Sequence, residues 1–210
     1  YWSGSSSNKS NNWSKSTLKT ELNGTYLSTL LASSGVNSKL SSAIVNAKWH
    51  LGGASSSNYQ ALTAEGIYTE ERRPSAMYSG NPSSIYAKVG LMYPSDYGYA
   101  TVGGTTTNKS SCRAKELYNW DSSSYSDCKN NDWLFTSQAT SWGSNNNEWL
   151  LSPFSSNSTN AAYLASSGRV SLSFFVSYGQ FAVRPTFYLD SSILKIVGGD
   201  GSSSNPYRIG

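Results

Sequence analysis

The hydrophobic period of the chain changes near Trp49, and this change constrains the fold more than any other feature. From Ser14 to Ala47, apolar side chains recur every three or four residues, the period of an amphipathic helix. After Trp49, apolar residues occur in short runs separated by Gly, Pro and Ser, which is typical of strands joined by polar turns. Helices followed by strands predict an α+β fold in which two helices pack on a twisted antiparallel sheet with long loops. We expect the two chain ends to lie close together.

The N-terminal helical stretch contains signals for its own boundaries. Ser14 or Ser16 is a suitable N-cap, because a Ser hydroxyl can accept a bond from a free amide of the first turn. We expect Asn23-Gly24 to break the stretch into pieces, and a second helix to end before Ala47. Both helices are short, so they need a sheet against which to bury their apolar stripes.

The strand region contains eight short candidate segments. Ser166-Ser167-Gly168 predicts a hairpin turn, and Pro185 predicts an edge or a bulge. Three segments, 54–68, 96–112 and 121–131, are expected to be long loops, which are uncommon unless they bind something or are disordered. The predicted strands are 47–51, 89–93, 148–151, 161–165, 169–172, 181–189, 194–197 and 207–209. The predicted core residues are Trp49, Leu91, Tyr93, Trp149, Leu151, Val183 and Phe187.

No boundary or repeat divides the chain after its first few residues. Residues 1–12 are rich in Ser and Asn and are expected to be flexible or bound at an edge. Residues 13–210 are expected to form a single domain. The chain begins with Tyr1 rather than Met, so we expect a mature product or an excised fragment from which an N-terminal anchor or helix has been removed.

The composition excludes several classes of protein. Charged residues make up only 13% and aromatic residues 13%, which argues against intrinsic disorder. No run of about 18 apolar residues occurs, so we expect no transmembrane segment in this chain. The net charge of +4 comes from scattered lysines and arginines, and this pattern predicts no nucleic-acid partner.

Cys112 and Cys128 are the only cysteines, and they flank a polar loop. Their spacing fits no zinc motif, and a chain with one histidine cannot complete a Cys2His2 site. We expect a disulfide, which would place the protein in an oxidising compartment. The alternative is a pair of buried free thiols.

The chain offers few residues for catalysis, and we expect it not to be an enzyme. His50 is the only histidine and lies in a predicted strand, and no Gly-x-Ser-x-Gly motif occurs. Glu70-Glu71-Arg72-Arg73 is a charge cluster that either orients a loop through ion pairs or presents a polar face. The segment 200–205 lacks the alternating acids of a calcium loop and is interpreted as a β-turn, so no metal and no cofactor are predicted.

Four segments together carry a resemblance to a known class of domain. They are 89–100 (VGLMYPSDYGYA), 149–153 (WLLSP), 183–189 (VRPTFYL) and 199–207 (GDGSSSNPY). The combination, which covers about Trp13 to Tyr207, resembles an uncharacterised domain of bacterial surface and pilin-like proteins. It is also similar to C-type-lectin-fold modules, including formylglycine-generating-enzyme relatives and the variable proteins diversified by retroelements.

The resemblance implies a C-type-lectin-like fold whose ligand face is built from C-terminal loops and strands. It also implies a secreted protein of the bacterial cell surface. Cys112 and Cys128 do not stand in the motif context of the copper-binding cysteines of the formylglycine-generating enzymes, and this departure argues against their oxidase chemistry.

Large rings interleaved with Ser, Gly and Asn favour a recognition surface in the C-terminal half. Rings give rigid contact area, while small polar residues supply adaptable hydrogen bonds. If Phe174 and Phe175 lie on one strand, they must point to opposite faces, so at least one ring faces a loop, a partner or solvent. The expected binding face comprises 142–147, 154–160 and 174–181, with Trp142, Asn145, Asn147, Phe174, Phe175, Tyr178 and Phe181 as ligand-binding residues.

These observations predict an extracellular recognition or adhesion module, an adhesin, that binds a protein or glycan and is carried by a pilus or an anchored shaft. The alternative is a structural subunit of a pilus-like filament, in which the same faces contact neighbouring subunits.

Overall fold

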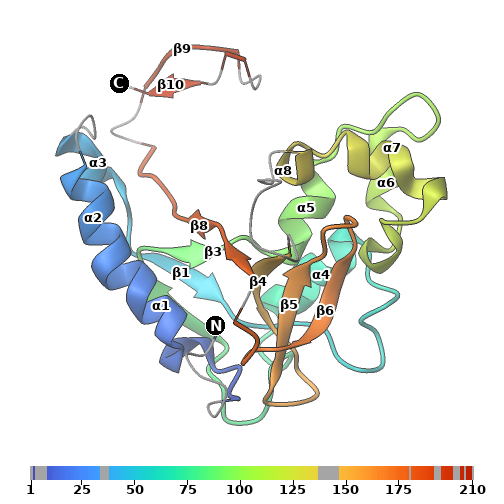
Figure 1. Cartoon of the computed structure of the whole chain (residues 1–210), viewed down its shortest axis with the longest axis horizontal. Helices are drawn as coiled ribbons and strands as arrows, with labels where there is room; N and C mark the ends of the chain where they lie inside the picture. The colour runs from blue at the N-terminus through green and yellow to red at the C-terminus, as the bar shows by residue number, and fades with distance from the viewer. Residues whose placement is uncertain are drawn as a thin grey trace.

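The computed structural model has helices on both sides of a layer of short strands (Figure 1). The structure describes residues 2, 9–33, 38–136, 147–179, 181–191, 195–200, 204–205 and 207–209. One group of helices comes from residues 17–43, and a second group comes from segments that connect strands between residues 64 and 136. The predicted α+β class is therefore confirmed.

The first helix runs past the point where we expected it to break. Helix α1 (Thr17–Glu21) continues through a π-helical turn (Leu22–Tyr26) into α2 (Leu27–Ala32). The Asn23 side chain, which lies in the π turn, donates to the Val89 carbonyl (2.8 Å) and accepts from the Val89 amide (2.9 Å). The expected break at Asn23-Gly24 is therefore wrong, because this segment stays helical and ties the helix to the strand layer.

The remaining N-terminal predictions agree with the structure. The Ser16 hydroxyl caps α1 by accepting from the Lys19 amide at 3.0 Å. A second helix, α3 (Ser38–Ala43), follows α2 and leads into the strand region.

The strands form four small sheets instead of one continuous antiparallel sheet. Strand β1 (Ala47–His50) pairs with β2 (Ser84–Ala87), and β3 (Gly90–Leu91) pairs with β8 (Pro185–Thr186), both antiparallel. The largest sheet has the order β6-β5-β4-β7. Its members are β4 (Glu148–Pro153), β5 (Asn160–Leu164), β6 (Val170–Phe175) and β7 (Ala182–Val183).

The largest sheet also departs from the expected direction of its strands. Strand β7 runs parallel to β4, so this sheet is mixed and the antiparallel expectation holds only in part. The predicted single strand over 181–189 is divided at Arg184, and its two halves join different sheets. The predicted hairpin between β5 and β6 is confirmed, with Gly168 at φ +96° in its turn.

The three segments expected to be long loops each contain short helices. Their helices are short and begin at polar caps, such as Thr63, which accepts from the Gly66 amide, and Asn108, which accepts from the Ser111 amide. Hydrophobic periodicity misses such helices because few of their residues face a core. The helices between residues 64 and 136 are α4 (Ala64–Arg72), α5 (Pro94–Ala100), α6 (Lys109–Arg113), α7 (Ser126–Asn130) and α8 (Trp133–Thr136), with 3-10 turns at Leu117–Asn119 and Ser123–Tyr125. A further 3-10 turn, Trp13–Lys15, precedes α1.

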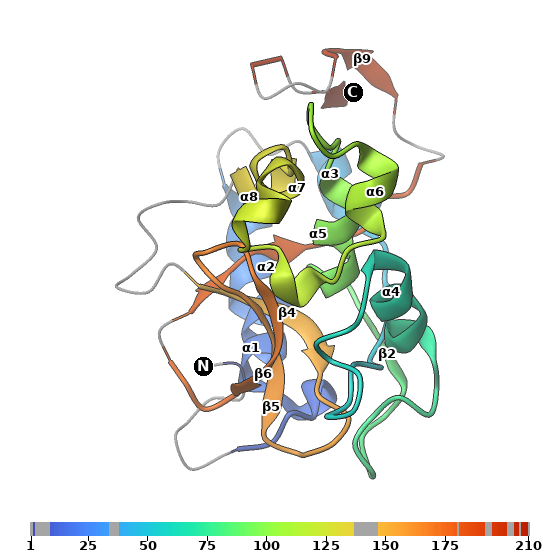
Figure 2. The same cartoon turned by 90° about the vertical axis from the view of Figure 1, so that its right-hand side faces the viewer.

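The buried side chains form two clusters, one on each side of the strand layer. Figure 2 shows α4, α6 and α7 nearer the viewer, with α1 and α2 behind the strands. The first cluster packs the N-terminal helices and contains every predicted core residue: Trp49, Leu91, Tyr93, Trp149 and Leu151 are buried, and Val183 and Phe187 pack against them. The second cluster lies under the connecting helices and includes Trp120 and both cysteines.

The first described residues belong to the same body. Trp2 is fully buried, 4.9 Å from the Trp13 ring, and its indole donates to the Leu150 carbonyl at 3.1 Å. The side-chain amide of Asn11 donates to the Phe154 and Asn160 carbonyls at 2.9 and 2.8 Å. Where the segment 1–12 is described, it is therefore bound against the sheet.

The C-terminal hairpin stands away from the body of the protein (Figures 1 and 2). Among the described residues, strand β9 (Ile196–Gly198) pairs with β10 (Arg208–Ile209) alone. Strands were predicted on both sides of this polar turn, at 194–197 and 207–209. Trp2, by contrast, contacts β4 and the end of β6. The expectation that the two chain ends lie close together is therefore wrong for the described residues.

Gly53 provides a test of the packing between β4 and the segment after β1. A Cβ at this position would lie 1.9 Å from the Pro153 carbonyl oxygen, which is backbone and cannot move aside cheaply. We expect Gly53→Ala to lower the free energy of unfolding by about 3 kcal/mol in urea titration. Gly24→Ala is the matched control, because nothing lies within 4 Å of the added Cβ and the site is helical, so its stability should be unchanged or higher. Equal stability of the two variants would contradict this packing.

Candidate functional site

Five aromatic rings pack together behind the outer end of the largest sheet. Phe174 on β6 lies 5.1 Å from Tyr163 and 4.9 Å from Phe181, measured between ring centroids. Phe181 in turn lies 4.6 Å from the buried Trp149 ring. Tyr178 closes the cluster at 5.2 Å from both Phe174 and Phe181. The rings hold one another in place, so the surface above them is rigid.

Phe175 and Tyr178 form the exposed part of this region. Phe175 is 58% exposed and Tyr178 is 37% exposed, whereas Phe174 is only partly buried and Phe181 is buried. The prediction that Phe174 and Phe175 face opposite ways is thereby confirmed. Lys9, Phe175, Ser177 and Tyr178 line a shallow hollow of about 210 Å³, called the Phe175 hollow below.

The other expected binding residues take different positions. Trp142 and Asn145 lie outside the described residues. The Asn147 side chain accepts from the Ser166 amide at 2.9 Å, so it fastens the β5–β6 turn instead of facing a ligand. Phe181 is a core ring, which corrects its assignment as a direct contact, because a side chain 8% exposed presents almost no surface to a partner.

The segment 154–160 is held by hydrogen bonds to the protein itself. Phe154 is buried in the second cluster, and the Asn157 side chain accepts from the Thr159 and Asn160 amides, both at 2.9 Å. The Asn160 side chain donates to the Ser173 hydroxyl at 2.9 Å. In this part of the expected face Ser156 is exposed, residues 155 and 157–159 are partly buried, and Phe154 and Asn160 are buried.

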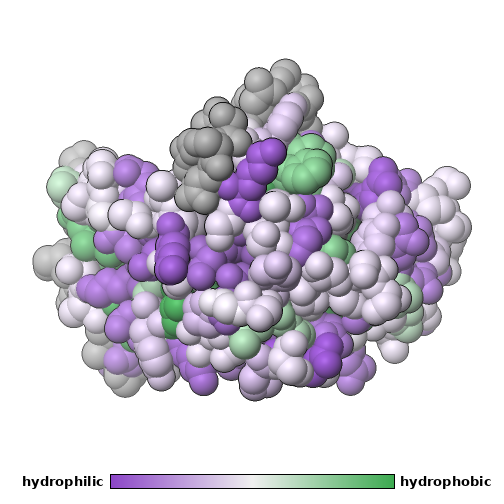
Figure 3. Space-filling view, turned by 90° about the horizontal axis from the view of Figure 1, so that it is seen from below, coloured by the Kyte–Doolittle hydropathy of each residue, from purple (hydrophilic) through white to green (hydrophobic). Residues whose placement is uncertain are grey.

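The surface seen from below Figure 1 is mostly hydrophilic or weakly polar, with hydrophobic residues in small separate groups (Figure 3). Recognition on such a surface depends on a few individual rings.

Trp133 is an exposed ring that the expected binding face did not include. It is 62% exposed on α8, whereas Trp120 is fully buried. The Asp132 carboxylate accepts from the Leu134 and Phe135 amides and so caps the start of α8.

The charge cluster of α4 is built around a buried carboxylate. Glu71 is fully buried and accepts from the Ser95 amide (2.9 Å), the Ser95 hydroxyl (2.6 Å) and the Arg72 guanidinium (3.0 Å). Burial raises the pKa of Glu71 to about 8, against the opposing effect of these hydrogen bonds. The Arg73 guanidinium pairs with Glu70 on the surface. Of the two readings of this cluster, ion pairs that position a segment agree with the structure.

A second buried carboxylate joins β4 to α5 and to the link between β7 and β8. Glu148, at the start of β4, accepts from the Tyr97 hydroxyl at 2.7 Å and contacts the Arg184 guanidinium at 3.2 Å. Burial raises the pKa of Glu148, while Arg184 and the Tyr97 hydroxyl oppose that rise. Nearby, burial raises the pKa of Asp132 to about 7. These groups are enclosed by the protein, so their perturbed pKa values reflect packing.

His50, the only histidine of the chain, lies on β1. Burial, with Arg72 and Lys48 nearby, lowers the pKa of His50, and its backbone bonds to the Tyr93 hydroxyl fix β1 to the neighbouring segment. Within the part of the chain that the structure describes, no three His, Cys, Asp or Glu residues come together as a metal site. Residues 201–203 of the turn considered for calcium lie outside that part.

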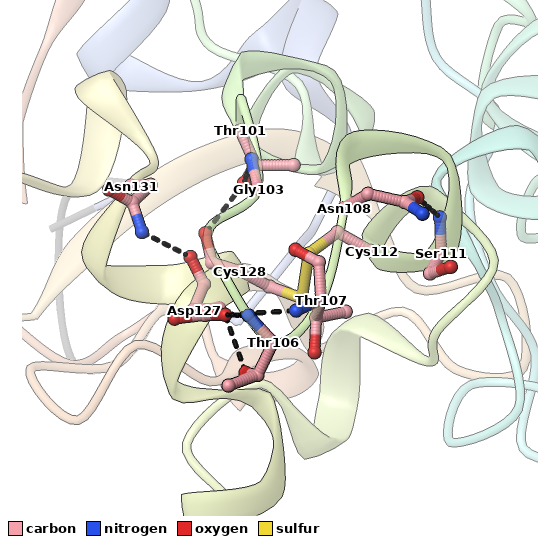
Figure 4. The surroundings of a disulfide bond; sticks show 10 residues. All are labelled: Thr101, Gly103, Thr106, Thr107, Asn108, Ser111, Cys112, Asp127, Cys128 and Asn131. Carbon is pink, nitrogen blue, oxygen red and sulfur yellow. Dashed lines mark hydrogen bonds between the residues drawn. A yellow bond between two sulfur atoms is a disulfide. The ribbon is translucent and has the colours of Figure 1, made fainter.

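Cys112 and Cys128 form the predicted disulfide, with both residues fully buried and their Cα atoms 5.3 Å apart. The bond joins α6 to α7 (Figure 4). Beside it, Asp127 accepts from the Thr106 amide (2.6 Å), the Thr106 hydroxyl (2.5 Å) and the Thr107 amide (2.9 Å), and these bonds lower the pKa of Asp127.

The helices of the described part of the chain include none with the length and apolar character of a membrane span.

Comparisons with family models, with curated proteins and with solved structures find no match for this chain.

The disulfide should contribute substantially to stability. It closes a ring between residues 16 apart, for which the chain-entropy model gives about 3 kcal/mol. We expect the paired variant Cys112→Ser with Cys128→Ser to lose that amount of unfolding free energy in urea titration. Ser111→Ala, an exposed neighbour on α6, is the control and should change stability little. Thiol labelling that finds two free thiols in the native protein would contradict the bond.

Proposed function

We propose that this chain is a recognition or adhesion module, displayed on the outside of a bacterial cell, that binds a protein or glycan through Phe175 and Tyr178. The observation that carries the proposal is the arrangement of the rings. Tyr178 packs on Phe174 and Phe181, and Phe175 lies beside it in the same hollow, so little side-chain entropy is lost at Tyr178 when a partner binds. The hollow beside them, with Lys9 on its rim, gives a partner a place to insert.

The extracellular setting is supported by the disulfide, since such bonds persist in oxidising compartments. The described fold, with its N-terminal helices, small sheets and long connecting segments, is compatible with a C-type-lectin-like architecture and with the surface-protein resemblance of the sequence. We include that architecture in the proposal. A non-enzymatic role is supported by the enclosure of the perturbed carboxylates Glu71 and Glu148.

The test separates ring contacts from ring packing. We expect Phe175→Ala and Tyr178→Ala to keep the wild-type melting temperature within about 2 °C and to weaken attachment about 30-fold, as interface hot spots do. Phe174→Ala should instead cost about 3 kcal/mol of stability, because it removes a ring that packs on four others. Attachment is measured on arrays of glycans and of immobilised host-surface proteins.

Tyr86→Ala is the matched control, since Tyr86 is 66% exposed on β2, outside the ring cluster. Attachment that survives Phe175→Ala and Tyr178→Ala, or that falls equally with Tyr86→Ala, would refute the assignment of the site.

A filament subunit is the second candidate function, and the C-terminal hairpin favours it. Ile196, Val197 and Tyr207 are 67%, 64% and 56% exposed on a two-stranded hairpin that stands apart from the body. An isolated hairpin is marginal in water, so a neighbouring subunit would stabilise it. Negative-stain microscopy of the native cell surface decides between the two: a filament built of this chain alone supports the subunit and sinks the adhesin.

A further inference from the structure

A second hollow lies among the connecting helices, on different elements from the Phe175 hollow. It has a volume of about 450 Å³ and is lined by Thr63, Glu65, Tyr99, Ser110, Arg113 and Ala114, and it is called the Arg113 hollow below. Its walls come from the ends of α4, α5 and α6. A hollow of this size accommodates a small organic molecule such as a monosaccharide.

Arg113 brings to this hollow a positive charge that forms no ion pair among the described residues. The ion pairs among the described residues use Arg72, Arg73, Arg169 and Arg184, and none of them uses Arg113. The Arg113 Nε is buried and has no hydrogen-bond partner in the part of the chain that the structure describes. This Nε is enclosed by the protein, so a ligand in the hollow would meet the exposed part of the Arg113 side chain.

The guanidinium is oriented by an aromatic ring. Its central carbon lies 5.0 Å from the centroid of the Tyr99 ring, and one Nη lies 3.5 Å from the Tyr99 carbonyl oxygen. Tyr99 is 37% exposed and contacts Tyr68 edge-on at 6.0 Å, and Arg72 stacks on Tyr68 at 3.5 Å. Two contacting tyrosine rings therefore lie between two arginines on this surface, and a planar guanidinium held against a ring suits a carboxylate.

The remaining lining residues define the rest of the ligand. Thr63, Ser110 and Glu65 supply hydroxyl and carboxylate oxygens, which accept hydrogen bonds from sugar hydroxyls. The Glu65 carboxylate also disfavours a purely anionic molecule, so an occupant must offer donors as well as a negative charge. A sugar acid has all three required parts: a carboxylate for Arg113, hydroxyls for the oxygens, and a C–H face for the Tyr99 ring.

We infer that the Arg113 hollow is a binding site for an acidic sugar, in which Arg113 holds the carboxylate and Tyr99 contacts the pyranose ring. The site shares no residue with the Phe175 hollow, so its test does not depend on the proposed function.

The experiment titrates the folded protein with free sugars and follows amide chemical shifts by NMR. The probes are galacturonic acid and N-acetylneuraminic acid, with galactose and sodium acetate as neutral-sugar and simple-carboxylate controls. We expect saturable shifts at Tyr99, Ser110 and Arg113 with an acidic sugar, and at least tenfold weaker binding of galactose and of acetate.

Variants then test the roles of the residues. Arg113→Gln should weaken acidic-sugar binding at least tenfold, Arg113→Lys should weaken it less, and Tyr99→Leu should weaken it about fivefold. Arg73→Gln is the matched control, because it removes an exposed arginine at the C-terminal end of α4 without touching the hollow.

The inference is overturned if wild-type protein shows no saturable shifts at the hollow with either acid, if galactose or acetate binds equally well, or if folded Arg113→Gln binds like wild type. If Arg113→Gln does not fold, the wild-type shift map and Arg113→Lys decide the matter by the same criteria.

Discussion

The carboxylate of Glu148 is fully buried at the start of β4, and the position of that strand depends on how its charge is satisfied. A buried carboxylate costs several kcal/mol unless it is paired and hydrogen-bonded. Tyr97 donates to it from α5, and Arg184 contacts it from the link between β7 and β8. One carboxylate therefore joins three segments that are far apart in the chain, namely α5, β4 and the link between β7 and β8.

A similar device operates at Glu71, whose carboxylate receives the Ser95 amide and hydroxyl at the start of α5. The two carboxylates thus tie the start and the middle of one short helix, α5, to α4 and β4. The polar residues of this region are used for packing the connecting segments, whereas the residues proposed to bind partners, Phe175, Tyr178 and Arg113, lie at the surface. This division explains how a chain with few charged residues can keep long connections in a fixed place.

The predictable part of the fold was the part that depends on hydrophobic period. The strands near Trp49, Leu91, Trp149 and Phe174 and the N-terminal helices follow from it, and so does the opposition of Phe174 and Phe175 across β6. The connecting helices were taken for loops because they are polar and begin at caps such as Thr63. The π turn at Asn23 depends on its contacts with Val89, which lies 66 residues later, and local sequence cannot supply such a partner.

The site was predictable only in outline. Ring content indicated the 174–181 region, but sequence could not separate the packed Phe181 from the exposed Tyr178, since that depends on the path of the chain after β6. Arg113 carried no signal of its own, because its importance comes from the absence of a carboxylate partner among the described residues and from the Tyr99 ring beside it.

A double-mutant cycle on Glu148 and Arg184 tests most directly whether the contacts of the buried Glu148 carboxylate hold the fold together. The variants are Glu148→Gln, Arg184→Met and their combination, and the free energy of unfolding is measured in urea. Each single variant should lose about 3 kcal/mol, because it leaves a buried group without its partner, and the double variant should lose at least about 2 kcal/mol less than the sum. Losses that simply add, or single variants as stable as wild type, would show that this pair does not hold the structure together.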